Sequence, residues 1–128
     1  MNVAVCIVSG AVADTNSVRP QSMQQGATLV FEGMVRDEEG GRPIRALNYE
    51  VYDPMASRML TELAQQTLVR HELLALTVEH SQGEVAVGRR SFRLTVHAKH
   101  RKESLAAATE FIDRMKQDVP IWKTPLYG

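Results

Sequence analysis

Residues 103–123 read ESLAAATEFIDRMKQDVPIWK and contain the clearest helical pattern in the chain. At about 100° per residue, apolar side chains recur along one stripe and polar side chains fall opposite. The stripe consists of Leu105, Ala108, Phe111, Ile112, Met115 and Val119. We therefore predict a helix from about Glu103 to Asp118, which Pro120 ends and which buries this stripe.

Four nitrogen-bearing side chains around this helix indicate an anion site. Lys116 lies at the edge of the stripe, where a lysine can lay its methylene groups on the core and direct its ammonium into a neighbouring cleft. His100 and Arg101 precede the helix at its positive N-terminal end, which favours an anion. Ile121–Trp122 should anchor the segment after the helix, so that Lys123 is held in place.

The balanced charge of the chain indicates that the anion bound at this site is small. The chain has 128 residues, a length typical of one domain, and we predict a single domain over residues 1–128. Lysine plus arginine total 15 and aspartate plus glutamate total 15, so the molecule lacks the field that attracts nucleic acid or an anionic membrane. Any anion that binds must therefore be recognised locally.

The single cysteine, Cys6, excludes an internal disulfide and a cysteine-rich metal site, and it fits a reducing compartment. It lies in an apolar segment, which favours a buried, unreactive thiol over a catalytic one. The N-terminus lacks the basic start and cleavage site of a signal peptide, and no apolar run approaches the ~18 residues of a membrane helix. We expect a soluble, cytoplasmic protein.

Apolar patterns predict about six strands and a further helix before the final helix. The strands should cover residues 3–8, 26–33, 44–52, 74–80, 84–87 and 92–98. The further helix should run from about 54 to 71, with Asp53 as its N-cap and Pro54 in its first position. The methionines expected to fill the core are Met55, Met59 and Met115. Two long helices packed on a mainly antiparallel sheet make an α+β fold.

Three other features are interpreted as structural. His80 and His97 alternate with apolar strand residues, and their spacing does not match a metal site. The acidic residues 37–39 fall in a polar, glycine-rich loop over residues 36–43, which is typical of a solvated surface. None of these features adds a metal ligand or a second candidate site.

Five short motifs also occur in order over residues 26–123. They are Gly26-Ala27 through Phe31-Glu32-Gly33-Met34-Val35-Arg36, Leu47-Asn48-Tyr49-Glu50-Val51-Tyr52 with Met55, His80 with Gly83 and Gly88, His100-Arg101, and Lys116 with Pro120-Ile121-Trp122-Lys123. In this order they resemble the MoaE family, the large catalytic subunits of molybdopterin synthase. The resemblance implies the α/β hammerhead fold of that family and a homodimer.

The resemblance implies a sulfurtransferase of molybdenum cofactor biosynthesis. Each large subunit of the family accepts the C-terminal Gly-Gly tail of a small ubiquitin-like, MoaD-like carrier, and two carriers complete a heterotetramer. The carrier arrives as a thiocarboxylate, and two such sulfurs are added to cyclic pyranopterin monophosphate (precursor Z) to form the molybdopterin dithiolene. The implied substrate-binding positions are Met34, Val35, Arg36, His100, Arg101, Lys116, Lys123, Thr124 and Pro125, of which Lys116 and Lys123 are implied to be catalytic.

Fixed positive charge suits this chemistry, because a cyclic phosphate and a thiocarboxylate are both anions. Arg36 and Arg101 can clamp phosphate oxygens, and His100 can donate or shuttle a proton. Lys116 can stabilise the species formed as sulfur leaves the carrier, and Lys123 is suited to hold a terminal carboxylate or the phosphate. The sequence does not separate the roles of the two lysines. The transfer itself requires neither a metal nor an organic cofactor.

Two departures from the family pattern leave an alternative function open. Ser81 follows His80 where the family often has arginine. Residues 124–128 stand where family members commonly continue with an acidic residue and a further tail, so the pocket is expected to be more open or to be closed by Leu126 and Tyr127. The alternative is a non-catalytic module that binds the glycine tail of a ubiquitin-like sulfur carrier.

Overall fold

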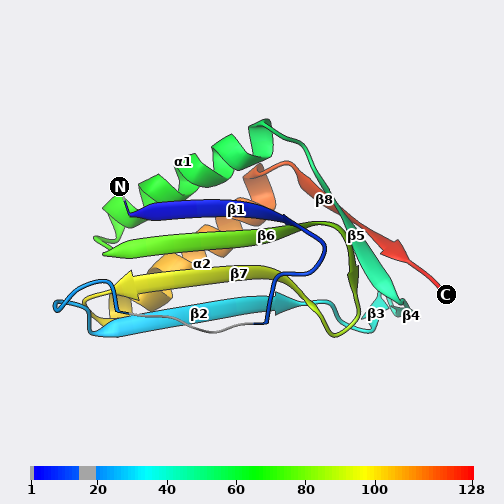
Figure 1. Cartoon of the computed structure of the whole chain (residues 1–128), viewed down its shortest axis with the longest axis horizontal. Coiled ribbons are helices and arrows are strands. Elements are labelled where there is room, and N and C mark those ends of the chain that lie inside the picture. Colours follow the sequence, from blue (N-terminus) through cyan, green and yellow to red (C-terminus); the bar gives the residue numbers. More distant parts are fainter. Residues whose placement is uncertain (1, 15–19) are drawn as a thin grey trace.

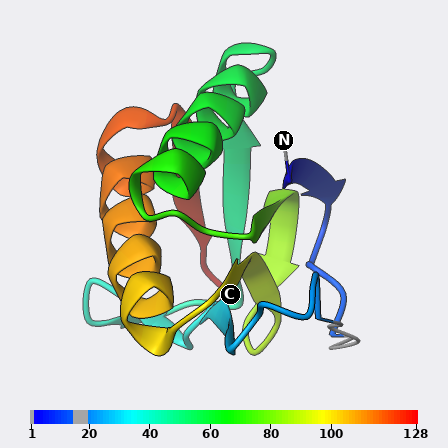
Figure 2. The same cartoon turned by 90° about the vertical axis from the view of Figure 1, so that its left-hand side faces the viewer.

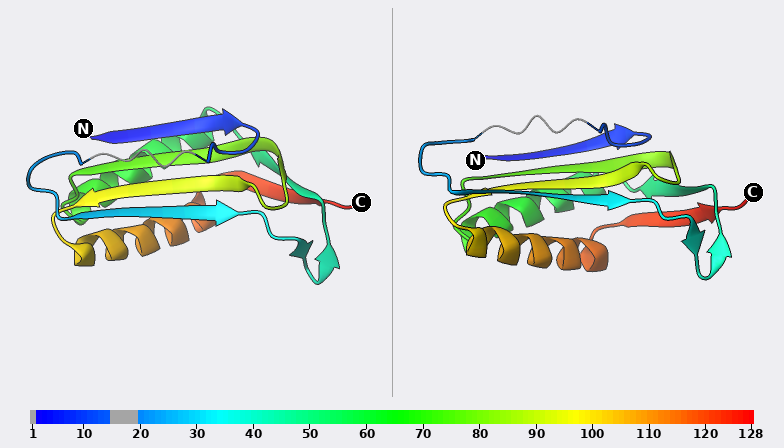
Figure 3. Two further views of the ribbon diagram at one scale, coloured as in Figure 1. Left: turned by 60° about the horizontal axis from the view of Figure 1, so that its bottom comes forward. Right: turned by 90° about the horizontal axis from the view of Figure 1, so that it is seen from below.

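A twisted sheet and two helices form two layers (Figures 1 and 2). This computed structural model describes residues 2–14 and 20–128. The main sheet contains β1 (Val3–Ser9), β2 (Ala27–Met34), β5 (Ala46–Val51), β6 (Ala75–Ala86), β7 (Arg90–Ala98) and β8 (Ile121–Leu126), and a small hairpin contains β3 (Glu38–Glu39) and β4 (Arg42–Pro43). The helices α1 (Met55–Arg70) and α2 (Arg101–Asp118) cover one face of the sheet (Figure 3). No described helix is both long and apolar enough to span a membrane.

The strand order is β2-β7-β6-β5-β8, and β1 pairs with β6. All of these pairs are antiparallel except β1 with β6, which is parallel. The predicted α+β fold, with two helices on a mainly antiparallel sheet, is therefore confirmed. The predicted helices are also confirmed, although α1 begins one residue later and α2 two residues earlier than expected.

The strands predicted at 74–80 and 84–87 are one continuous strand, β6, so that prediction was wrong. Gly83 was interpreted as a boundary, but it lies inside the strand with φ of 91°. Pairing of β6 with β7 ends at His80, and pairing with β5 begins at Gly83. Glycine permits this conformation without a steric cost, and it marks the point where β6 passes from one neighbour to the other.

Two further elements were not predicted as strands. The loop at 36–43 contains the β3–β4 hairpin, whose turn residues Gly40 and Gly41 have φ of 60° and 78°, as a tight hairpin requires. The segment after α2 is β8, which pairs with β5 at the edge of the sheet. Pro125 obscured this strand in the sequence, because proline is tolerated in an edge strand but is unusual elsewhere in a sheet.

The core lies between the helices and the sheet, and it corrects three predictions of burial. In α2 the buried residues are Ser104, Ala107, Ala108, Phe111 and Met115, whereas Leu105 is 54% exposed. The predicted stripe is otherwise retained, with Ala108, Phe111, Met115 and Val119 buried, but at its N-terminal end Ser104 and Ala107 are buried in place of Leu105. In α1 the buried stripe begins at Ala56, so Met55 is 57% exposed and is not core filler.

Cys6 was predicted to be buried, but it is exposed. In β1, Val3, Val5 and Ile7 pack against the core, and the residues between them face away. The strand is therefore half-buried, because the helices cover only one face of the sheet.

The opposite face of the sheet carries a buried ionic network. The guanidinium of Arg93, whose side chain is 6% exposed, pairs with Glu32 at 2.7 Å and with Glu79 at 3.3 Å, and it donates to the carbonyl oxygen of Ala13. Arg90 also pairs with Glu32 at 2.7 Å. Burial raises the pKa of Glu32, but hydrogen bonds from Arg93 and Arg90 outweigh this, so its pKa lies below the usual value of 4.5.

Replacing Glu32 tests the contribution of this network to stability. Glu32→Gln should lower the free energy of unfolding at pH 7 by about 2 kcal/mol, because the buried Arg93 loses a charged partner. Since the folded pKa of Glu32 is depressed, its contribution is present above pH 4.5 and is lost as the pH falls through the folded pKa. Urea unfolding between pH 7 and pH 3 should show a weaker acid dependence in the variant. Glu84→Gln, which breaks the exposed pair with Arg45, should cost under about 0.5 kcal/mol; equal losses in the two variants would contradict the prediction.

Candidate active site

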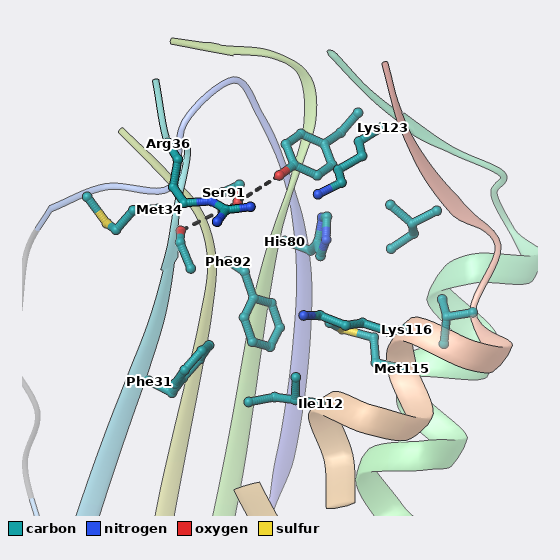
Figure 4. A pocket seen from close by; sticks show the side chains of 14 residues that line it. Phe31, Met34, Arg36, His80, Ser91, Phe92, Ile112, Met115, Lys116 and Lys123 are labelled. Atoms are coloured by element: carbon teal, nitrogen blue, oxygen red, sulfur yellow. Dashed lines mark hydrogen bonds between the residues drawn. The ribbon is translucent and has the colours of Figure 1, made fainter. Parts of the chain in front are cut away.

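One cavity of about 550 Å³ opens between the end of β2, the start of β7, the last turns of α2 and the start of β8 (Figure 4). Three of the predicted site cations, Arg36, Lys116 and Lys123, line this cavity. Figure 4 shows their side chains pointing into the same space from the loop after β2, from the end of α2 and from β8. The structure therefore brings together residues that lie up to 87 positions apart in the sequence.

Helix packing places Lys116. Met115, the preceding residue, is buried against the sheet, and Ile112, one turn earlier, lines the cavity. Lys116 is thus at the border of the buried stripe, as the helical pattern predicted, and its ammonium reaches the cavity. Among the described residues it forms no ion pair, and the same holds for Arg36.

Strand pairing places Lys123. In the β5–β8 ladder, Lys123 lies opposite Tyr49, and both residues line the cavity. The prediction that Lys123 is held in place is confirmed by this ladder. Its ammonium lies 3.4 Å from a carboxylate oxygen of Glu39 on the β3–β4 hairpin.

Aromatic rings form the wall opposite the lysines. The centroids of Tyr49 and His80 are 5.3 Å apart, those of His80 and Phe92 are 5.8 Å apart, and those of Phe92 and Phe31 are 6.1 Å apart. The hydroxyl of Tyr49 donates to Ser91 at 3.1 Å, which fixes the direction of the phenol. None of these residues was predicted to contact a ligand, because each falls in an ordinary alternating strand pattern.

His80 is part of the cavity rather than only a structural residue. Its Nδ1 lies 2.8 Å from the carbonyl oxygen of Ser81, and a carbonyl can only accept, so Nδ1 carries the proton. Burial lowers the pKa of His80, and the hydrogen bond to Ser81 only partly offsets this. The ring is therefore neutral near pH 7, and its Nε2 is an acceptor in a cavity whose charged groups, Arg36, Lys116 and Lys123, are donors.

His100 and Arg101 do not reach this cavity. They lie at the start of α2, and Lys116 is fifteen residues later, which corresponds to about 22 Å along the helix axis. Both residues are exposed, and His100 pairs with Glu103 at 3.3 Å. The predicted single cluster is therefore split in one copy of the chain, because residues at opposite ends of a long helix are close in sequence but distant in space.

The remaining predicted positions fall into two groups. Met34 lines the cavity and is 45% exposed. Val35 is buried in a small second core with Ile44 and Val85, and its backbone bonds with Gly88 and Arg89, so it does not line the cavity. Thr124 and Pro125 continue β8 beyond Lys123, outside the cavity lining. Among the described residues, no three His, Cys, Asp or Glu side chains gather as metal ligands would.

Comparisons with known proteins agree on one family. Residues 8–118 match the sequence model of the MoaE protein family. A molybdopterin synthase catalytic subunit of Pyrococcus abyssi is 36% identical over 102 residues, which cover 80% of this chain and 69% of that protein. One from Oryza sativa subsp. japonica is 36% identical over 107 residues, 84% of this chain. The match spans only 55% of the rice protein's own length.

Solved structures are similar over most of the chain. The crystal structure of molybdopterin synthase from Staphylococcus aureus has a TM-score of 0.79 and 29% identity, and the match covers 85% of this chain and 80% of that one. A complex of subunits 1 and 2 of molybdopterin-converting factor from Helicobacter pylori has a TM-score of 0.74 and 26% identity, and covers 97% and 89%. The family match, the relatives and the fold lead to the same conclusion: this chain belongs to the MoaE family.

Proposed function

We propose that this chain is the catalytic subunit of a molybdopterin synthase, acting as one domain over residues 1–128. It transfers sulfur from the C-terminal thiocarboxylate of a small ubiquitin-like carrier to precursor Z, which forms the molybdopterin dithiolene. The observation that carries this proposal is the convergence of Arg36, Lys116 and Lys123 on one cavity. The relatives named molybdopterin synthase catalytic subunit support it.

The cavity suits two anionic reactants. Its cations offset the repulsion between a phosphate and a thiocarboxylate, and they replace part of the hydration that both lose on entry. When sulfur leaves the carrier, the oxygen of a water molecule takes its place, and the acyl carbon passes through an oxyanion that an ammonium stabilises. Lys116 and Lys123 are the candidates for this role, since both reach the cavity. The tilted rings of the aromatic wall offer apolar faces and edges against which a ring system can pack.

The carrier is expected to bind this chain through its glycine tail. The Helicobacter pylori structure is a complex of two subunits, which supports such a partner. Phe31 and Met34 line the cavity and are 42% and 45% exposed, so an uncharged glycine tail can pass over apolar side chains on its way to the lysines. We place the complex in the cytoplasm, as two chains with two carriers.

His100 and Arg101 fit this function only if the chain forms a dimer. Because they lie about 22 Å from Lys116 along α2, they cannot serve the cavity of their own copy. In a two-fold dimer, each copy can donate the start of α2 to the cavity of the other. We propose that the complete site combines Arg36, Lys116 and Lys123 of one copy with His100 and Arg101 of the second.

Lys116→Ala tests the central role of the cavity. With a thiocarboxylated carrier and precursor Z, dithiolene formation should fall at least about 100-fold, because an oxyanion loses its stabilising charge. The melting temperature should stay within about 2 °C, since Lys116 is exposed. Arg114→Ala, which removes a cation from another face of α2, should remain active. A large drop in the melting temperature of Lys116→Ala would make this lysine structural instead.

Mixing two inactive variants tests the shared site. Lys116→Ala and Arg101→Ala, dissociated and reassociated together, should recover about a quarter of wild-type activity, because half of the dimers are mixed and each mixed dimer has one intact site. Each variant alone should stay inactive. No recovery in the mixture would show that Arg101 does not complete the cavity of the other copy and would contradict the shared site.

The alternative function, a non-catalytic module that binds the carrier tail, predicts a different result. Calorimetry should then show carrier binding by the wild-type chain, while no dithiolene forms under conditions in which a known synthase is active. Product formation by the wild-type chain would exclude the alternative.

A further inference from the structure

The β3–β4 hairpin brings a carboxylate to the rim of the cavity. Glu39 lies 3.4 Å from the ammonium of Lys123, and the two side chains are 29% and 51% exposed. Among the ion pairs of the described residues, this is the only one that involves a cation lining the cavity; Arg36 and Lys116 have none. Within the described residues, the cavity therefore presents two cations without a carboxylate partner and a third, Lys123, that is paired with Glu39.

Contacts at both ends of the hairpin fix the position of Glu39. The backbone N–H of Ile44 donates to the carbonyl of Asp37 at 3.1 Å and closes the base of the hairpin. The guanidinium of Arg42 lies 3.8 Å from the centre of the Tyr127 ring, which ties the hairpin to the chain just beyond β8. Since β8 also carries Lys123, the carboxylate and the ammonium belong to elements that are held together.

Comparison with the neighbouring Glu38 shows that the contact of Glu39 with Lys123 depends on its position in the strand. Glu38 precedes Glu39 in β3, and successive residues of a strand point to opposite faces. Glu38 is exposed and forms no ion pair within the described parts of the chain, although it carries the same charge. The acidic loop predicted to be a solvated surface therefore contains one carboxylate that contacts the site and one that does not.

We propose that Glu39 is a positioning residue that holds Lys123 at the rim of the cavity and competes with an incoming anion for its ammonium. This inference rests on the proposed function, in which Lys123 contacts the terminal carboxylate of the carrier or the phosphate of the substrate. When the ligand binds, the ammonium of Lys123 exchanges the carboxylate of Glu39 for the anionic carboxylate or phosphate of the ligand. Weakly binding anions are disfavoured, because they must displace Glu39 to use the third cation.

The expected size of this effect is small but measurable. An ion pair at this exposure changes a binding constant by a factor of about two to five. Removing the charge of Glu39 should therefore tighten anion binding by about this factor, and the gain should shrink as salt screens the cavity. Removing the charge of Glu38 should change the affinity much less, because its carboxylate is directed away.

The first experiment measures anion binding to the full chain by calorimetry at low salt. The probes are inorganic phosphate and a short peptide that ends in Gly-Gly with a free carboxylate, with the C-terminal amide of the same peptide as the uncharged control. Glu39→Gln should lower the Kd for phosphate and for the free peptide about two- to fivefold, with no change for the amide. Glu38→Gln should match the wild-type chain. Equal tightening in the two variants would reduce the effect to net charge and overturn the proposal.

A double variant links the effect to Lys123. In a Lys123→Gln background, Glu39→Gln should no longer change the affinity for phosphate. The ammonium for which Glu39 and phosphate compete is then absent. If the tightening persists without Lys123, Glu39 acts on the cavity in another way and the proposal is wrong.

A second experiment requires no substrate, so its failure is separate from failure of the proposed function. An amine-directed ester is added to the wild-type chain and to the two glutamine variants, and labelling of Lys123 is followed by mass spectrometry with Lys116 as the internal reference. Glu39→Gln should speed labelling of Lys123 relative to Lys116 about two- to fivefold, because the ammonium is no longer held by a carboxylate. Equal ratios in all three proteins would overturn the proposal even if sulfur transfer is confirmed.

Discussion

The packing of α2 on the sheet is the interaction on which the site depends. Phe111 is fully buried between the helix and the strands, and burying a phenylalanine contributes about 1.5–3 kcal/mol. Met115 is buried one turn later, so the rotation of the helix is fixed along its second half. The next residue, Lys116, then points into the cavity. Apolar contacts therefore hold a cation beside other cations, a placement that electrostatic repulsion alone would disfavour.

The second lysine depends on register rather than on helix rotation. Lys123 lies opposite Tyr49 in the β5–β8 ladder, and a shift by one residue would turn it to the other face of the sheet. The neighbouring side chain opposes such a shift, because Trp122 contacts the ring of Tyr52 edge-on with centroids 4.5 Å apart. The exposed pair of Tyr52 and Trp122 on one face of the sheet thus helps to hold Lys123 on the other face.

The sequence predicts what local periodicity controls and misses what depends on pairing between distant segments. The position of Lys116 at a helix border follows from the 3.6-residue period, and the structure agrees. Leu105 shows the limit of this pattern, since at the start of α2 the small residues Ser104 and Ala107 are buried and the leucine is exposed. The contribution of His80 was missed, because its alternating strand pattern does not show which strands lie beside it. The contact between Glu39 and Lys123 was missed for the same reason, since a hairpin and an edge strand meet only in the folded chain.

The distribution of charge explains how a neutral molecule can recognise anions. The chain has no net charge, so its field does not attract a carrier or a substrate from a distance. In the cavity, Arg36 and Lys116 form no ion pair with a carboxylate of the described residues, and Lys123 pairs with Glu39. These three cations give the cavity a local positive potential, which decays over about 8 Å, the Debye length at physiological salt. An anion is recognised only after it arrives, and selectivity then depends on the apolar mouth of the cavity and on whether the ligand can take Lys123 from Glu39.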